Sequence, residues 1–479
     1  DMGEASDGSV WLAVTNYGIY CRKDGKVSRY LCEKASVLGR CCLAFDSEGH
    51  LFMGSASEGL FVFDNSSDAF SPVAGTGHLN VSVLCPLSDG RVMLGTDGEG
   101  AMVYRFGECS PQPCDYFHAQ VDLEHAKISS ILEDRDGNIW LGLFQKGVFM
   151  QPHQDSGFSY VGYKSGRYDI IGSACVMSVY AGKDCTLWVG TDNDGLYALD
   201  MKSYAVSHYS SDTGGLPATI TSIVEDKDGK LWLGSYWGGA GWLDRQTGQF
   251  NRLPFTCRGM AVHVFRLLAD AEDNLWIATL GDGLKKYNLK THELTEYKVQ
   301  PEAFEPKGNS LTNMWVNDLC LSEDGRRLYI CMSSGLACLD LKHDDFVSTF
   351  GRNCILTEQP VHTVVEDSKG QLWVGTHDGI FVLDSHGRMK RHYTTDDGLP
   401  DNYIASMRFD IQNNIWISTF HGLSMLDLKR GNFTNYYASH GLQGNEFSER
   451  ASCGWDSLMV FGGNCGLTFF SPETVCRAR

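Results

Sequence analysis

The feature of this sequence that most restricts its fold is a phrase that recurs about every 45 residues, a spacing typical of repeat architectures. In the clear copies, two residues separate an Asp-Gly turn from Trp-Leu/Val-Gly-Thr or a close variant, and a short polar turn with Gly-Leu follows. Weaker copies carry Phe, Met or Tyr in place of the tryptophan. The eleven copies centre on Trp11, Phe52, Met93, Trp140, Trp188, Trp232, Trp276, Tyr329, Trp373, Trp416 and Met459.

Each copy contains four short runs that are typical of β-strands. In the copy around Trp232 these runs cover residues 220–224, 231–235, 241–243 and 249–253, bounded by Gly, Asp and Asn. The Asp-Gly between the first two runs predicts a tight hairpin, because glycine adopts the positive φ that such turns need. Four antiparallel strands at this spacing predict a β-propeller blade, in which the recurrent tryptophan packs between neighbouring blades.

Eleven blades exceed the four to eight of a usual ring, so we expect an all-β chain with two β-propellers. Counting back from the end assigns seven blades, from Trp188 to Met459, to a second ring at residues 153–479. The last copy stops before its outer strand, and we predict that residues 158–163, Phe-Ser-Tyr-Val-Gly-Tyr, supply this strand. Residues 1–152 would then hold four blades of an incomplete ring.

The start of the chain falls inside the first repeat. Residues 4–8 align with residues 133–137, which follow a strand in later copies. This alignment predicts that the first repeat lacks its first strand and that the sequence is a fragment of a longer protein. The blades expected in the first ring are those around Trp11, Phe52, Met93 and Trp140.

The composition argues against several functions. A net charge of −19 with scattered basic residues argues against a nucleic-acid partner, and no run of about eighteen apolar residues is present that could span a membrane. The seventeen cysteines include no Cys-x-x-Cys pair, so neither a metal site nor a cofactor is expected. Cys109 and Cys114 are the best candidates for a disulfide, whereas Cys320 and Cys338 are expected to act as small hydrophobic strand residues.

Two stretches resemble a known family. Residues 364–380, Val-Val-Glu-Asp-Ser-Lys-Gly-Gln-Leu-Trp-Val-Gly-Thr-His-Asp-Gly-Ile, are similar to the two-component regulator propeller repeat of hybrid two-component sensor kinases from gut Bacteroidetes. Residues 441–447 and 461–473 resemble the closing repeat of that family's second propeller. The resemblance implies a periplasmic, non-catalytic sensing region that binds a glycan-derived oligosaccharide and relays its occupancy to a downstream kinase. It further implies a homodimer formed through the parent receptor, with membrane attachment only through downstream regions.

Candidate ligand contacts follow from the antiparallel order of the strands. The turn between the second and third strands of a blade lies on the same face as the connection to the next blade, and loops on a rigid scaffold usually carry recognition. The copy around Trp232 has an aromatic, glycine-rich turn where the others are small and polar, and its rings are expected either to stack on a sugar or to pack between blades. The candidates on this face are Tyr236, Trp237, Trp242, Trp315, Asn317, His377, Asn402, Tyr403, Phe420, His421, Asn445, Glu446 and Arg450.

The alternatives are a propeller enzyme and a protein-binding scaffold. Sialidase-type aspartate boxes differ from this repeat by one residue in spacing, and a streptogramin-lyase-like propeller is the closer enzymatic alternative. No Gly-x-Ser-x-Gly, His-Glu-x-x-His, phosphate-loop or EF-hand motif is present. Paired acids such as Glu225 and Asp226 recur in several repeats, which indicates a turn role, because catalysis needs one constellation rather than many. We therefore expect no catalytic residues in this segment.

Overall fold

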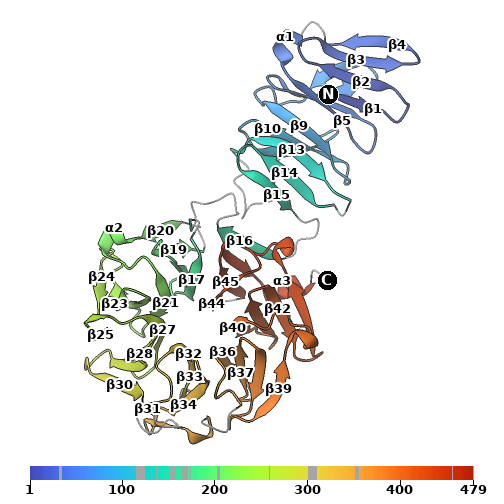
Figure 1. Ribbon diagram of the computed structural model, residues 1–479. Helices are drawn as coiled ribbons and strands as arrows, with labels where there is room; N and C mark the ends of the chain where they lie inside the picture. Colours follow the sequence, from blue (N-terminus) through green and yellow to red (C-terminus); the bar gives the residue numbers. More distant parts are fainter. Residues whose placement is uncertain are drawn as a thin grey trace. The chain divides into compact units, whose positions relative to one another are not determined.

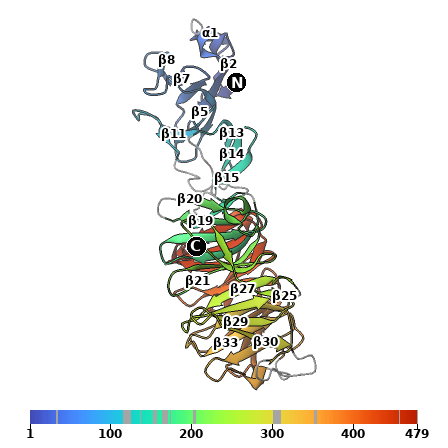
Figure 2. The ribbon, with the colours of Figure 1, turned by 90° about the vertical axis from the view of Figure 1, so that its left-hand side faces the viewer.

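The chain folds into two compact units, residues Asp1–Ser156 and Gly157–Arg479, each built almost entirely of β-sheet. Figure 1 and Figure 2 show the ribbon in two views. The two units are described separately below. The computed structural model describes residues 1–31, 35–114, 125–135, 137–151, 157–162, 171–172, 174–201, 205–257, 259–299, 310–350, 355–455 and 457–477.

The first unit contains four antiparallel sheets, one for each of its repeats, and three of the sheets have four strands. The prediction that the first repeat lacks its first strand is wrong. Residues Met2–Glu4 pair with the next strand, from Met2 opposite Leu12 to Glu4 opposite Val10, so the strand is shortened but present. The elements are β1 (Met2–Glu4), β2 (Val10–Val14), β3 (Gly18–Lys23), β4 (Lys26–Tyr30), α1 (Ala35–Leu38), β5 (Cys41–Phe45), β6 (Leu51–Ser55), β7 (Gly59–Asp64), β8 (Ala69–Pro72), β9 (Val81–Pro86), β10 (Arg91–Thr96), β11 (Ala101–Arg105), β12 (Gln112–Pro113), β13 (Ile128–Glu133), β14 (Ile139–Leu143) and β15 (Gly147–Gln151).

The second unit contains seven sheets of four or five strands, apart from one two-stranded hairpin. The innermost strands of these sheets contact one another in cyclic order, and the last of them contacts the first, so the sheets form a ring (Figure 1). The predicted strands of the repeat around Trp232 agree with the structure to within two residues. The elements of the first four sheets, with the hairpin β25–β26, are β17 (Val176–Ala181), β18 (Thr186–Thr191), β19 (Leu196–Asp200), β20 (Val206–Tyr209), α2 (Ser211–Gly214), β21 (Ile220–Glu225), β22 (Leu231–Ser235), β23 (Gly239–Leu243), β24 (Phe250–Arg252), β25 (Thr256–Cys257), β26 (Met260–Ala261), β27 (Val264–Ala269), β28 (Asn274–Thr279), β29 (Leu284–Asn288), β30 (Leu294–Val299), β31 (Ser310–Leu311), β32 (Val316–Leu321), β33 (Arg327–Met332), β34 (Leu336–Asp340), β35 (Asp345–Phe346) and η2 (Ser348–Phe350).

The remaining sheets complete the ring, and the last of them takes its outer strand from the start of the unit. Its order is β16-β46-β45-β44, with Phe158 opposite Phe470 and Gly162 opposite Gly466. The predicted pairing of this segment with the last repeat is thereby confirmed. A Cβ added at Gly162 would lie 2.1 Å from the carbonyl oxygen of Cys465, so the close approach of the strands requires glycine here. The remaining elements are β16 (Phe158–Gly162), β36 (Val361–Glu366), β37 (Leu372–Thr376), β38 (Gly379–Leu383), β39 (Met389–Tyr393), η3 (Thr395–Asp397), β40 (Ile404–Phe409), β41 (Ile415–Thr419), β42 (Gly422–Asp427), β43 (Asn432–Tyr436), η4 (Ala438–His440), β44 (Phe447–Trp455), β45 (Leu458–Gly463), β46 (Gly466–Phe470) and α3 (Pro472–Arg477).

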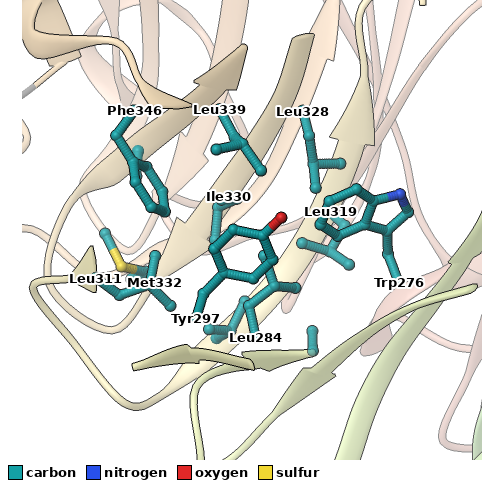
Figure 3. Packing of buried hydrophobic residues seen from close by; sticks show 13 residues of the cluster. Trp276, Leu284, Tyr297, Leu311, Leu319, Leu328, Ile330, Met332, Leu339 and Phe346 are labelled. Carbon is teal, nitrogen blue, oxygen red and sulfur yellow. The ribbon is translucent and has the colours of Figure 1, made fainter. Parts of the chain in front are cut away.

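The recurrent tryptophan is a packing residue. Trp276 is fully buried and stacks on Tyr297 of the outer strand, with ring centroids 5.8 Å apart, among Leu284, Leu319 and Leu328 (Figure 3). This cluster joins residues of β27–β31 to residues of β32–β35, so it fills the space between neighbouring sheets. The interpretation of the tryptophan as a contact between blades is confirmed for the buried copies Trp188, Trp232, Trp276, Trp373 and Trp416, whereas Trp140 is 39% exposed.

In five of the described repeats, a carboxylate in the first turn accepts a hydrogen bond from the tryptophan. In the repeat around Trp232, Asp226 Oδ1 accepts the backbone N–H groups of Asp228 and Lys230, and Oδ2 accepts the indole N–H at 2.8 Å. The turn role predicted for the recurring acids is confirmed for Asp226, since its carboxylate satisfies three donors of its own blade. The same bond joins Trp140 to Asp134, Trp276 to Asp270, Trp373 to Asp367 and Trp416 to Asp410.

The described cysteines form no disulfide, so the predicted pairing of Cys109 with Cys114 is wrong. Cys114 is buried in a hydrophobic cluster, whereas Cys109 is exposed, so the two side chains have different surroundings. Cys338 is buried against Leu372 and Phe381, with Cys320 at the edge of the same cluster, as expected of small hydrophobic residues. Burial raises the pKa of both thiols to about 12, so they remain protonated at neutral pH.

Candidate functional site

Exposed aromatic side chains lie on one face of the second ring, at turns between the second and third strands of a sheet and at a connection between sheets. Trp237 lies in the turn from β22 to β23 and is 72% exposed, and Phe420 lies in the equivalent turn from β41 to β42 and is 42% exposed. Trp315 immediately precedes β32 and is 51% exposed. Large apolar side chains exposed together on a loop face mark a site of interaction.

The first aromatic group consists of Tyr236, Trp237 and His263. The Trp237 ring meets the Tyr236 and His263 rings edge-on, with centroids 4.8 Å apart in both cases. His263 Nδ1 also hydrogen-bonds the carbonyl oxygen of Tyr236. Gly238 allows this turn, because an added Cβ would lie 2.3 Å from the Pro217 ring. The turn is therefore held from both sides while the Trp237 ring faces solvent.

The second group surrounds the start of the inner strands β36, β40 and β44. Tyr403 stacks on Phe420 with ring centroids 3.9 Å apart, and His362 lies 4.5 Å from Tyr403 on another side. The Tyr403 hydroxyl donates to Glu449 Oε1, and Glu449 Oε2 accepts from Arg450 Nη1 at 2.9 Å. The group therefore combines two stacked rings with an ion pair, and three blades contribute to it.

A contact from the second group reaches the start of β27, next to the first group. The Arg450 guanidinium lies over the Phe265 ring, 3.9 Å from its centroid, and Phe265 is two residues beyond His263. A cation over an aromatic face is an attractive arrangement. The contacts therefore link the second group, through Arg450, to the strand that begins beside the first group.

Burial and neighbouring charges set the ionisation of the second group. Burial lowers the pKa of His362, and its Nε2 is buried without a hydrogen-bond partner among the described residues. Burial opposes ionisation of Glu449, but Arg450, the Tyr403 hydroxyl and His362 outweigh it and hold the pKa of this carboxyl below its usual value. At neutral pH the group therefore holds a neutral imidazole beside a carboxylate paired with a guanidinium.

The stability of the second unit should fall as the pH is lowered below 6.5 because of His362. The unfolded imidazole has its ordinary pKa of 6.5, whereas the pKa in the fold is lower, so the unfolded state binds more protons in this window. The expected result is a decrease in the free energy of unfolding between pH 7 and pH 5.5 that is smaller in His362→Phe. Urea unfolding across this range measures it, with His343→Gln as the control, since that side chain is 65% exposed. Equal slopes in wild type and His362→Phe would contradict the assignment.

Several predicted contacts have structural roles instead. Trp242 lies within β23 opposite Trp232, half-buried beneath Lys230 Nζ, 3.9 Å from its ring centroid, so it is not a turn residue. Asn317 is buried and donates to the carbonyl oxygen of Val361. Both side chains lie within the sheets of the ring and not on the turn face.

Two predicted asparagines fix the connections between sheets. Asn402 Oδ1 accepts the N–H of Thr395, and Asn445 Oδ1 accepts the N–H of Ala438, both at 2.8 Å, at the starts of η3 and η4. Their side chains shape these connections in the same way in two successive blades. The other predicted candidates, His377, His421 and Glu446, are exposed on the turn face.

Sequence reasoning missed His263, His362 and Glu449. His362 and Glu449 lie on inner strands that carry a register irregularity near their start, which changes the simple alternation of buried and exposed positions. Arg450, which was predicted, has a φ of 59° at this irregularity. The only signal in the sequence was a charged or imidazole side chain at a position where most other repeats carry an apolar or hydroxyl residue. Among the described residues, no three His, Cys, Asp or Glu side chains are grouped as a metal site would require.

Comparison with known proteins identifies the repeat. Residues 122–145, 214–237, 355–378 and 398–421 match the two component regulator propeller family. The chain contains two-component regulator propeller repeats. The resemblance inferred from the sequence is thereby confirmed, and one matched copy ends at Trp237 while another ends at His421, so the two-component regulator propeller repeats include the turns described above.

Proteins similar to this chain include a histidine kinase and extracellular domains of two component systems. Over 203 residues the chain is 25% identical to Histidine kinase P4 of Formosa agariphila, a match covering 41% of this chain and 14% of that protein. The extracellular domain of a putative hybrid two component system from B. thetaiotaomicron matches its fold with a TM-score of 0.66 at 20% identity, covering 100% of this chain and 62% of that one. The extracellular domain of a second putative hybrid two component system from the same organism matches with a TM-score of 0.55 at 18% identity, covering 98% and 64%.

The chain thus spans less than two thirds of the length of each of these proteins. The structural matches show the shared all-β propeller fold. In the part of the chain that the structure describes, no helix has the length and apolarity needed to cross a bilayer.

Proposed function

We propose that this chain is the extracytoplasmic, periplasmic sensing region of a hybrid two-component signalling protein. In this proposal it binds a glycan-derived oligosaccharide on the turn face of the second ring, and the parent protein relays occupancy to a histidine kinase, through a homodimer of the receptor. The similarity to a histidine kinase and to extracellular domains of two component systems supports the signalling role. The chain itself is proposed to be non-catalytic.

The oligosaccharide is proposed as the ligand on the basis of the exposed aromatic rings. An indole that is 72% exposed has a large apolar face in water, and the apolar face of a pyranose is a suitable partner for it. Polar groups lie close by: His263 beside Trp237, and Glu449 and Arg450 beside the stacked Tyr403 and Phe420. Hydroxyl groups of a sugar can donate to a carboxylate and accept from a guanidinium, so the combination suits an oligosaccharide better than a purely apolar ligand.

The same geometry supports binding without chemistry. Glu449 is paired with Arg450 and bonded by Tyr403, which leaves it an ionised carboxylate rather than a proton donor at neutral pH. The recurring aspartates of the turns are occupied by their own tryptophans. A hydrolase or lyase remains the enzymatic alternative, and product release from a glycan during incubation with the chain would favour it over the sensor.

Replacing Trp237 with Ala is expected to weaken oligosaccharide binding by about tenfold or more, because an aromatic anchor contributes on the order of 1–3 kcal/mol. Since the side chain is exposed, the melting temperature should remain within about 1 °C of wild type, as surface substitutions change stability by about 0.5 kcal/mol or less. Isothermal titration calorimetry against a panel of neutral and acidic oligosaccharides measures the affinity.

The matched control is Ile411→Ala. Ile411 is also a highly exposed apolar residue, but it lies in the turn between β40 and β41, on the opposite face of the ring. Its loss should leave binding unchanged. A double variant, Trp237→Ala with Trp315→Ala, that folds and binds as tightly as wild type would exclude the proposed site.

A further inference from the structure

Three arginines from three different sheets reach into the centre of the second ring. Arg266 lies on β27, Arg408 on β40 and Arg450 on β44, all innermost strands of their sheets. They line a cavity of about 400 Å³ together with residues of β32 and β36. The other repeats carry mostly apolar or hydroxyl residues at the equivalent positions, so the repeat itself does not require three guanidinium groups in one cavity.

The carboxylates nearby leave one of these charges unpaired. Arg266 Nε lies 3.2 Å from Asp318 Oδ1, and Arg450 Nη1 lies 2.9 Å from Glu449 Oε2. Among the described residues, Arg408 has no ion pair, and its Nε is buried without a hydrogen-bond partner. Burial also lowers the pKa of Arg408, although a guanidinium remains charged at neutral pH.

Arg450 also has donor capacity left for this cavity. Its side chain is 5% exposed and its Nε has no hydrogen-bond partner among the described residues, although Nη1 is bonded to Glu449. A buried donor without a partner destabilises the folded state. Arg266 Nε likewise has no hydrogen-bond partner among the described residues, so three guanidinium groups with a buried, unsatisfied donor line one cavity, and an anion that accepted from two of them would reduce this penalty.

The rest of the lining includes hydroxyl groups and acids. Ser406 and Ser452 hydroxyl oxygens lie 2.5 Å apart, and Thr363 lines the same cavity. The other titratable groups of the lining are Cys320, Asp318, Glu323 and Glu366, of which Glu323 is exposed and Glu366 accepts the backbone N–H of Glu323. Three carboxylates therefore share the lining with three guanidinium groups, so we expect only a small anion to fit beside the arginines.

We propose that this cavity binds one small oxyanion group, a carboxylate or a sulfate, with Arg408 as its principal ligand and Arg450 as the second. A planar guanidinium matches such a group with two parallel hydrogen bonds. The bound anion bridges β40 and β44, and Arg266 adds a third positive charge from β27. Arg450 is also one of the polar groups of the proposed oligosaccharide site, whereas Arg408 and Arg266 belong to the cavity alone.

The test is a calorimetric titration of the whole chain with sodium sulfate and, separately, with sodium acetate, against sodium chloride at matched ionic strength. One site is expected for sulfate or for acetate, and the arm that binds identifies the source of the oxyanion. Arg408→Gln should weaken this binding by about tenfold or more, as expected for loss of a charge-assisted bidentate contact. Arg430→Gln is the control, because that side chain is 81% exposed.

A second variant distinguishes loss of anion binding from loss of folding. Arg408→Lys keeps the positive charge but not the planar fork, so its melting temperature in chloride should match wild type while its affinity for the anion falls. Equal binding by wild type and Arg408→Gln, or heats no larger than those in chloride, would overturn the proposal and indicate an adventitious ion only. Trp237→Ala should retain anion binding, so failure of the oligosaccharide site and failure of this site are distinguishable.

Discussion

Val161→Asp should destabilise the second unit by about 4 kcal/mol, because it places a carboxylate without a partner in a hydrophobic cluster. Val161 is 3% exposed and lies on β16, packed with Leu187, Val460 and Leu467. This single position connects the outer strand of the closing sheet to the sheet of β17–β20. Hydrogen exchange of the β16 and β46 amides, followed by mass spectrometry, measures the local loss of protection.

Ser159→Asp is the matched control, since it adds the same charge on the same strand and Ser159 is only half-buried. We expect it to reduce the free energy of unfolding by about 1 kcal/mol or less. If the β16 and β46 amides exchange equally in the two variants, β16 does not contribute to ring closure.

Asp226→Ala should reduce the free energy of unfolding by about 3 kcal/mol, the second large effect. The side chain is 7% exposed and accepts from two backbone N–H groups and from Trp232 Nε1, so its loss leaves buried donors without partners. Urea unfolding followed by tryptophan fluorescence measures the change. The emission of the folded state should also respond, because the indole N–H loses its acceptor.

The control for Asp226 is Asp244, an aspartate in the later turn of the same blade. Asp244 Oδ1 accepts the N–H groups of Gln246 and Thr247, but no buried side chain depends on it. Asp244→Ala should reduce the free energy of unfolding by about 1 kcal/mol or less. Equal effects of the two substitutions would contradict a stabilising role for the bond to tryptophan. A catalytic role for the recurring acids would then have to be tested.

The fold was predictable because the same sequence pattern recurs along the chain. The turn aspartate, the glycine after it and the tryptophan each have one fixed task, so their spacing gives the strand order without any long-range contact being known. The outer strand at residues 158–162 was also found, since the last repeat stops before an outer strand of its own. The shortened strand β1 was missed because three residues are too few to show a pattern.

Residues of the site were predictable only where they depart from the pattern of the repeat. Trp237 and Phe420 stand in turns whose equivalents are small and polar, and both are exposed. Trp242 was misplaced because a sequence cannot show where a turn ends and β23 begins when aromatic residues occupy both. Arg266 and Arg408 escaped notice because their significance depends on three distant strands facing one centre, which no local spacing reveals.

The closing sheet also determines how the second unit would respond to tension along the chain. β16 and β46 run antiparallel with Phe158 opposite Phe470, so forces on the preceding and following segments act on the same end of the pair. Hydrogen bonds loaded in this direction break one after another, at a lower force than strands sheared along their length. Val475 of α3 packs beside Gly157 at that end. The ring would therefore be opened by pulling most easily at the sheet that closes it.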